Sequence, residues 1–188
     1  MRAIEEIGIG KAARFALGEI QKALLKLAWL PPVRKWLLQV FGSRIGKETV
    51  VLNVDFINIH RTGFQGLRIG NHCFIGEGCM LDLASQIELK NHVTLSQRVV
   101  VNTHTNVGYK NHALQPRFPA FEKPVHIEEN CFVGVGSILL AGTRIGKHSF
   151  VGAASLVKGS VPPHSVIAGN PARPLQLKNQ ENSKEKKS

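Results

Sequence analysis

The sequence is short of several residue types, and each shortage narrows what the protein can be. Its 188 residues include 13 Asp and Glu against 24 Lys and Arg, which gives a formal net charge of +11. Only three cysteines occur and none forms a C-x-x-C pair, which argues against a disulfide framework and a zinc ribbon. No stretch of about 18 uncharged apolar residues occurs and no signal-peptide pattern opens the chain, so we expect a cytoplasmic chain without a membrane span.

What the sequence does contain is an aliphatic residue at every sixth position, in two long series. A helix repeats every 3.6 residues and a strand every two, so neither produces a period of six, whereas a solenoid of hexapeptide rungs does. The first series can be followed back through Ile45, Val51 and Ile57. The two full series are Ile69, Ile75, Leu81, Ile87, Val93 and Val99, and then Ile127, Val133, Leu139, Ile145, Val151 and Val157.

The residue two positions before each of these aliphatics is usually small. All three cysteines, Cys73, Cys79 and Cys131, take this position. We therefore expect them to be buried packing residues in a reduced compartment, and not metal ligands or nucleophiles. The residue after the aliphatic is often glycine, which suits the backbone geometry of a corner.

The series is interrupted between Val99 and Ile127, which are 28 residues apart. That separation is four hexads plus four residues, so the intervening chain must leave the coil as a loop, at about residues 103–124. Loops on rigid scaffolds commonly carry functional residues. We therefore look for the chemistry of the protein in this loop.

Residues 1–44 lie outside the repeat and predict two helices. Ile20, Leu24 and Leu27 form an apolar stripe on the first helix, and Gly42 closes the second. Two interpretations are open: the helices cap the open end of the solenoid, or they lie on an anionic membrane surface as basic amphipathic helices do.

The other end, residues 178–188, is polar and highly charged, and we expect a disordered basic tail. The positive charge of the chain belongs mainly to its two ends and to no recognised nucleic-acid-binding module. Nucleic-acid binding is therefore not expected.

Two strings are more specific than the repeat itself. One is N-H-V-T-L-S-Q-R-V-V-V-N-T-H at residues 91–104, and the other is V-P-P-H-S-V-I-A-G-N-P-A-R-P at residues 161–174. With them, residues 45–177 resemble the hexapeptide-repeat acyltransferases, in particular the sugar O-acetyltransferases of the galactoside, maltose and exopolysaccharide type. The resemblance implies an all-β fold, a left-handed parallel β-helix, with an N-terminal helical segment and an extruded active-site loop.

A coil of three hexapeptides has 18 residues and predicts specific neighbours. His72 and His92 are 20 residues apart, and His60 and His72 are 12 apart, which would place them on different faces of successive coils. A histidine-bound metal is therefore not expected. The predicted stacks in the first series are Ile69 under Ile87, Ile75 under Val93, and Leu81 under Val99.

The resemblance also implies a site. His104 lies where the loop leaves the coil, at the offset at which a catalytic histidine leaves it in the galactoside and maltose enzymes, and we expect it to be the general base. Asp82 matches an acidic residue that holds a sugar hydroxyl of the acceptor. Arg173 matches an arginine that binds a phosphate of coenzyme A. The expected contacts to coenzyme A are Gly134, Val135, Gly152, Ala153, Lys158 and Arg173.

Together these features predict an acetyl-CoA-dependent O-acetyltransferase that needs no metal. Its acceptor would be a sugar hydroxyl of a polysaccharide or of a lipid-linked saccharide precursor, and the resemblance implies a homotrimer. The apolar, basic N-terminal segment favours a glycolipid acceptor, with peripheral contact to the inner face of the membrane. Two alternatives stay open: an N-acetyltransferase acting on an amino sugar or another amine, and a non-catalytic scaffold.

Overall fold

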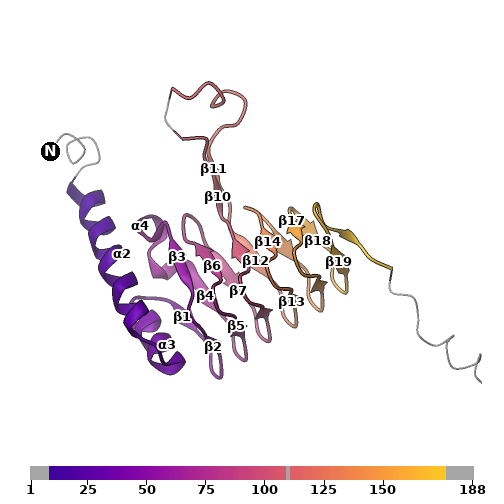
Figure 1. The fold of residues 1–188 in the computed structure, drawn as a ribbon, viewed down its shortest axis with the longest axis horizontal. Coiled ribbons are helices and arrows are strands. Elements are labelled where there is room, and N and C mark those ends of the chain that lie inside the picture. Colours follow the sequence, from indigo (N-terminus) through magenta and orange to yellow (C-terminus); the bar gives the residue numbers. More distant parts are fainter. Residues whose placement is uncertain (1–8, 109–110, 177–188) are drawn as a thin grey trace, which may run out of the picture.

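The computed structural model describes residues 9–108 and 111–176, in which the chain forms an elongated prism of short strands with two helices at one end (Figure 1). The expectation of a disordered tail at residues 178–188 falls outside the described residues.

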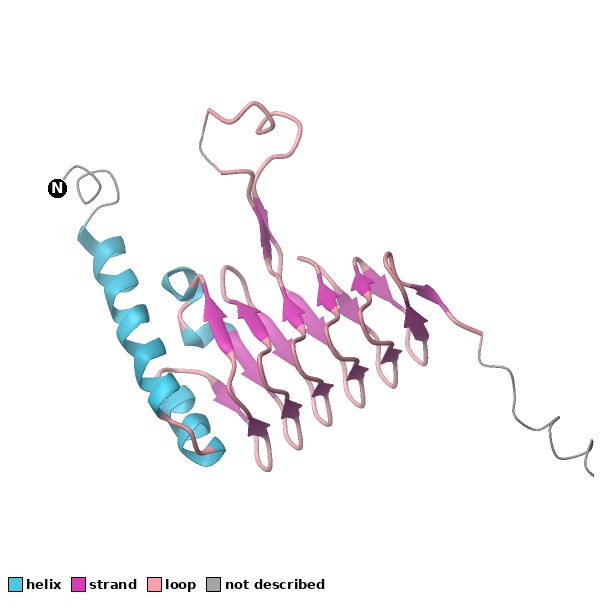
Figure 2. Ribbon diagram, in the orientation of Figure 1, coloured by secondary structure: helices cyan, strands magenta, loops and turns pink. Residues whose placement is uncertain are grey.

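Three parallel sheets form the faces of the prism (Figure 2). Successive strands pass from one sheet to the next, so the chain is a parallel β-helix, as the repeat predicts, of the left-handed kind that the family resemblance implies. The first sheet contains β1 (Arg44–Ile45), β4 (Leu67–Ile69), β7 (Ile87–Leu89), β12 (Val125–Ile127), β15 (Arg144–Ile145) and β18 (Ser160–Val161). The second contains β2 (Val50–Val51), β5 (Phe74–Ile75), β8 (Thr94–Leu95), β13 (Phe132–Val133), β16 (Phe150–Val151) and β19 (Val166–Ala168), with β20 (Arg173–Pro174) antiparallel at its end. The third contains β3 (Asp55–Ile57), β6 (Met80–Asp82), β9 (Val100–Val101), β14 (Ile138–Leu139) and β17 (Leu156–Val157).

The remaining elements interrupt or flank the prism. An antiparallel hairpin projects from the corner between the third and first sheets, where the sequence predicts a loop. These elements are α2 (Ile9–Leu27), α3 (Pro31–Val40), α4 (Ile59–Thr62), the 3-10 helix η1 (Phe64–Gly66), and the hairpin strands β10 (His104–Thr105) and β11 (Phe121–Glu122).

The second half of the solenoid has the predicted 18-residue register. Its pairs are Ile127 with Ile145, Val133 with Val151, and Leu139 with Val157. All six side chains are buried in one continuous core. The core therefore follows directly from the aliphatic period in this half.

The first half has a different register, and the predicted stacks are wrong there. The corner at residues 82–86 is two residues longer than a hexapeptide corner, so the coil from Ile69 to Leu89 has 20 residues (89 − 69 = 20) instead of 18. In the first coil, Phe56 takes the inward position predicted for Ile57. The observed pairs are Ile69 with Leu89, Ile75 with Leu95, and Leu81 with Val101.

The longer coil also brings two histidines together. His72 and His92 occupy the same corner of successive coils, and their rings stack with centroids 4.8 Å apart. The prediction that they lie on different faces is therefore wrong, because it assumed an 18-residue coil. Among the described residues, no group of three or more His, Cys, Asp and Glu side chains is arranged to hold a metal ion.

The cysteines are buried, as their place in the repeat predicts. The thiol of Cys79 lies 3.0 Å from the carbonyl oxygen of Ser96 in the next coil. Burial raises the pKa of Cys79 to about 11, so its thiol stays protonated near neutral pH. These thiols are packing groups and not nucleophiles.

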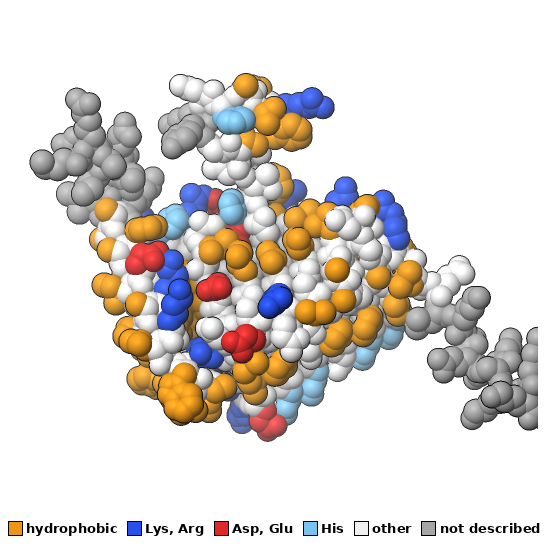
Figure 3. All heavy atoms as spheres, viewed as in Figure 1, with side chains coloured by type: hydrophobic (Ala, Val, Ile, Leu, Met, Phe, Trp, Pro, Cys, Tyr) orange, Lys and Arg blue, Asp and Glu red, His pale blue; other side chains and the backbone are white. Residues whose placement is uncertain are grey.

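The helices α2 and α3 cover the first coil through a narrow contact. Leu25 and Leu38 are buried, and the Arg34 guanidinium donates a hydrogen bond of 3.3 Å to the carbonyl oxygen of Val51. The apolar stripe predicted on the first helix faces the other way, so this helix caps the solenoid through residues outside its stripe (Figure 3). On the second helix, Leu37 and Phe41 are partly buried against the core. Neither helix is long and apolar enough to cross a membrane, in the part of the chain that is described. The exposed apolar side chains on and between the helices include Leu17, Ile20, Leu24, Leu27, Trp29, Leu30, Val33, Trp36 and Val40.

Glycines that follow an inward residue allow neighbouring coils to touch. A Cβ on Gly76 would lie 2.7 Å from the backbone nitrogen of Gln97 in the next coil. A left-handed backbone is instead needed two residues later, at Gly78, whose φ is +69°. Close approach of the coils, more than corner geometry, therefore explains the glycine at position 76.

Gly76→Ala is expected to lower the free energy of unfolding by about 1–3 kcal/mol, because the added methyl group overlaps backbone that cannot rotate away. The measurement is thermal unfolding followed by circular dichroism. Gly10→Ala in α2 is the matched control, since a Cβ there meets nothing within 4 Å. Equal melting temperatures for the Gly76 and Gly10 variants would contradict the contact.

Candidate active site

His104 is placed by the strand that begins the projecting hairpin. It opens β10 and lies opposite Glu122 of β11. Its backbone nitrogen donates a 3.2 Å hydrogen bond to the side-chain oxygen of Asn102. The imidazole Nδ1 lies 2.6 Å from Oδ2 of Asp82, which belongs to the preceding coil.

Asp82 receives hydrogen bonds from several parts of the chain. Its Oδ1 accepts from Nδ2 of Asn58 (2.7 Å) and from the backbone nitrogen of Ala84 (3.1 Å). Its Oδ2 accepts from the backbone nitrogen (2.8 Å) and hydroxyl (3.0 Å) of Thr103 as well as from His104. Burial by itself raises the pKa of Asp82, but these hydrogen bonds outweigh it and lower the pKa below its usual value. The carboxylate is therefore ionised at neutral pH.

An ionised carboxylate can only accept hydrogen bonds, so Nδ1 of His104 must carry the proton in their contact. The neutral imidazole then has its lone pair on Nε2, which is the form a general base requires.

The expected contact between Asp82 and the acceptor does not fit this arrangement. The Asp82 side chain is only 1% exposed, and both oxygens are occupied by groups of the protein. Asp82 is thus in a position to orient His104 and not to touch a sugar. Sequence comparison alone could not separate these roles, because both require an acid at the same position.

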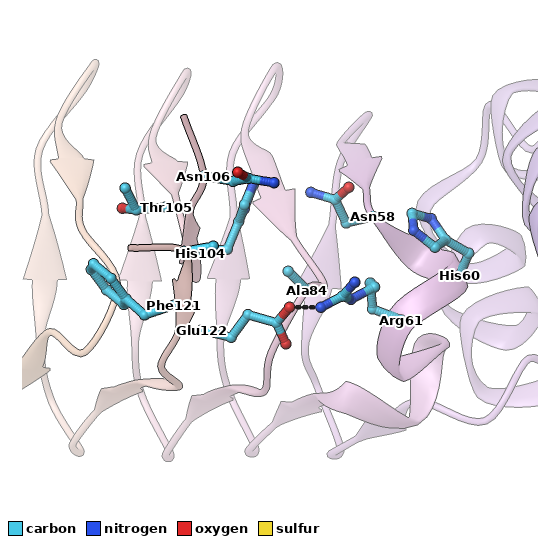
Figure 4. A pocket seen from close by; sticks show the side chains of 10 residues that line it. Asn58, His60, Arg61, Ala84, His104, Thr105, Asn106, Phe121 and Glu122 are labelled. Carbon is cyan, nitrogen blue, oxygen red and sulfur yellow. Dashed lines mark ion pairs between the residues drawn. The ribbon is translucent and has the colours of Figure 1, made fainter. Parts of the chain in front are cut away.

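The space in front of His104 is a pocket of about 610 Å³ between the hairpin and α4 (Figure 4). His60 and Arg61 enter it from α4, and Arg61 forms an ion pair with Glu122 of the hairpin across it. Arg61 and Glu122 belong to no motif, and His60 stood out only as a possible metal ligand, so the sequence did not point to this side of the pocket. Its one signal was the stretch between Phe56 and Leu67, which is longer than a hexapeptide.

The four small residues expected to contact coenzyme A lie together at another corner. Gly134 and Ala153 belong to successive coils, and a Cβ on Gly134 would lie 2.6 Å from the backbone nitrogen of Ala153. Val135 and Ala153 are exposed, while Gly134 and Gly152 are buried or partly buried. This corner joins the second sheet to the third, whereas His104 lies at the next corner, which joins the third sheet to the first. None of the four lines the pocket of His104.

Lys158 and Arg173, the two cations expected to bind coenzyme A phosphates, are brought together. Both are exposed and line a pocket of about 290 Å³ at the C-terminal end of the solenoid. Within the described chain, Arg173 Nη1 donates only to the neighbouring carbonyl oxygen of Ala172 (3.1 Å). The candidate coenzyme residues thus form two groups, both outside the pocket of His104.

Comparison with known proteins identifies the class to which this fold and site belong. A sequence profile described as the hexapeptide repeat of succinyl-transferase matches residues 124–158. The chain is 32% identical over 149 residues to Escherichia coli WcaF, to which a role as a colanic acid biosynthesis acetyltransferase is ascribed, and the alignment covers 77% of each chain. It is 31% identical over 141 residues to the galactoside O-acetyltransferase of Lactococcus lactis, over 75% of this chain and 66% of that one.

A solved structure agrees with these relatives. The hexapeptide-repeat acetyltransferase of Vibrio cholerae in complex with acetyl coenzyme A matches with a TM-score of 0.70 and 25% identity, over 83% of this chain and 84% of that one. The chain therefore belongs to the hexapeptide-repeat acetyltransferases, and it is an acyltransferase.

Asp82→Asn is expected to lower the free energy of unfolding by about 1–3 kcal/mol at pH 7, because buried donors lose their charged acceptor. Since the pKa of Asp82 is lowered in the folded state, its contribution to stability is present above about pH 3.9, the usual value in unfolded chains, and is lost as the pH falls below it. Denaturant unfolding of both proteins at pH 7 and pH 3 measures the effect. A stability gap that stays constant between the two pH values would contradict it.

Proposed function

We propose that this acyltransferase moves the acetyl group of acetyl-CoA to a hydroxyl group of a saccharide, with His104 as the general base. The observation that carries the proposal is the 2.6 Å contact between His104 Nδ1 and the buried Asp82 carboxylate, which leaves Nε2 available to an acceptor in the pocket. The acetyl-CoA bound by the Vibrio cholerae relative supports the donor.

The transfer needs one base and no covalent enzyme intermediate. As the acceptor oxygen attacks the thioester carbon, its proton passes to Nε2 of His104. The imidazolium that forms is stabilised by the negative charge of Asp82. When the carbon–sulfur bond breaks, coenzyme A leaves as a thiolate and takes the proton back, so the enzyme returns to its starting state.

A sugar hydroxyl is the acceptor that the relatives support best. Galactoside O-acetyltransferase acts on a saccharide, and WcaF is ascribed to the synthesis of a polysaccharide. The pocket offers amide and imidazole groups, including Asn58, His60 and Asn106, that are able to hydrogen-bond hydroxyl groups. The acceptor is therefore a polysaccharide or a lipid-linked saccharide precursor.

The proposed active unit is a homotrimer. Two faces of the prism are apolar on their outer side, with Phe132 and Phe150 stacked at 4.8 Å on the second sheet and Ile138 exposed on the third. The first sheet instead carries charged residues such as Arg44 and Arg144 outward. Burying the apolar faces between subunits would bring the coenzyme corner of one subunit to His104 of another, which a single chain does not do.

His104→Ala is expected to lower kcat/KM about 10²- to 10⁴-fold, because the acceptor loses its general base. The assay follows thiol release from acetyl-CoA with a panel of saccharides and glycolipid extracts. His72→Asn is the control, because His72 lies at an exposed corner between the first and second sheets, away from His104. Asparagine also tolerates the positive φ of this position. Unchanged activity of the His104 variant would refute the assigned base.

Treatment of the product with mild base separates the two acceptor classes in the same assay. An acetyl ester is cleaved and an acetamide is not. Release of acetate supports transfer to oxygen, and a stable product would establish the N-acetyltransferase instead. Failure to bind acetyl-CoA at all would favour the non-catalytic scaffold.

We infer that the enzyme lies at the inner face of the membrane. Trp29 and Trp36 are 79% and 60% exposed, on a face that points away from the solenoid. Lys22 and Lys26 flank this face, on the side nearer the solenoid. Exposed apolar and indole groups bordered by lysines are typical of helices that bind anionic lipid surfaces.

Leu27→Ser combined with Trp29→Ser is expected to weaken binding to vesicles of phosphatidylglycerol and phosphatidylcholine at least tenfold, because both side chains are exposed and their burial in lipid is lost. Vesicle co-sedimentation measures the binding. Leu175→Ser removes a similarly exposed side chain at the other end of the solenoid and should have no effect. If the double variant changes the oligomeric state and not vesicle binding, the face covers another copy of the chain.

A further inference from the structure

A second hollow adjoins the pocket of His104. It has a volume of about 380 Å³ and lies between α4, η1 and α2. His60 and Arg61 line both hollows, whereas Arg14 and Leu17 of α2 line only the second. The two hollows therefore lie next to each other at His60 and Arg61 and together extend from His104 past α4 to α2, the helix with the exposed apolar face; we call this row of two hollows the path.

The short helix α4 contacts the elements at both ends of this path, through hydrogen bonds at one end and packing at the other. Asn58, just before α4, donates to Asp82, and the hydroxyl of Thr62 donates to the carbonyl oxygen of Leu83 (2.8 Å). On the other side α4 packs against α2, where a Cβ on Gly18 would lie 3.6 Å from Cβ of Ile59. The part of α4 that carries His60 and Arg61 is thus fixed relative to both the Asp82 carboxylate and α2.

Positive charge gathers on this path. Burial lowers the pKa of His60, and the positive charges of Arg61 and Arg14 lower it further, so both guanidinium groups act at the same place. Glu122 neutralises one of them through its ion pair with Arg61. Within the described residues, the Arg14 guanidinium donates a hydrogen bond only to the carbonyl oxygen of Gly10 in its own helix. A net positive charge is left in the path.

We propose that Arg14, His60 and Arg61 form a binding site for the phosphate groups of a saccharide acceptor carried on a lipid. Guanidinium groups bind phosphate through paired hydrogen bonds, and the neutral imidazole of His60 is able to donate one more. The site lies between the apolar face of α2 and the pocket of His104. The lipid then lies at the membrane, the phosphate at α4, and the sugar over His104. This inference rests on the proposed saccharide acetylation and specifies its acceptor.

The test is titration calorimetry of the full chain with geranyl diphosphate, a short isoprenyl diphosphate that carries no sugar. Arg14→Gln and Arg61→Gln are each expected to weaken its binding at least tenfold, as is the double variant Arg61→Gln with Glu122→Gln, which avoids leaving an unpaired carboxylate. Arg144→Gln, an exposed arginine on the first sheet, is the matched control and should bind as the unaltered chain does.

Three further arms separate other sources of binding. Inorganic pyrophosphate should bind more weakly than geranyl diphosphate, and dihexanoyl phosphatidylglycerol more weakly still. Equal binding of the phosphatidylglycerol would mean that the site holds bilayer headgroups, which overturns the acceptor assignment. Loss of binding in Lys158→Gln with Arg173→Gln, but not in the Arg14 and Arg61 variants, would place the anion at the coenzyme end and also overturn it. Because no turnover is needed, the result stands apart from the His104→Ala assay.

Discussion

The hydrogen bond between Asp82 and His104 depends on groups that belong to different turns of the solenoid. Asn58 donates to the Asp82 carboxylate from the first coil, and Thr103 donates from the start of the hairpin. A buried carboxylate that lost these donors would carry a large desolvation cost. The stacked coils, α4 and the base of the hairpin must therefore fold together before His104 has its partner. The geometry of the Asp82–His104 pair is a property of the stack and not of the loop alone.

The period of six predicted the architecture well and the register of one coil badly, for a reason visible in the residues. Leu89, Leu95 and Val101 are also six residues apart, and each lies two residues C-terminal to a member of the predicted series. Both series are buried, because Val93 and Val99 fill the place that small residues take in other coils. Aliphatic spacing alone does not show which of the two series pairs with the strands of the preceding coil. Only strand pairing shows that the corner at residues 82–86 has two additional residues.

The sequence pointed to two residues of the candidate site. His104 was singled out by its offset from the coil, which the resembled enzymes share, and Asp82 by its place in a rung. Arg61 and Glu122 could not be singled out, because α4 and the hairpin have no repeat and meet only in space. The role of Asp82 could not be read either, since its partner Asn58 is 24 residues away and is brought near by coil stacking.

The stacking of coils also converts sequence length into distance. Neighbouring parallel strands are about 4.8 Å apart, and α4 follows β3 whereas His104 follows β9, two strands further along the third sheet. The separation between α4 and His104 along the axis of the prism is therefore about 10 Å. Adding or removing one coil before His104 would therefore change the distance between His104 and α4 in steps of one strand spacing, so the number of coils determines how long a molecule can extend from α4 to His104.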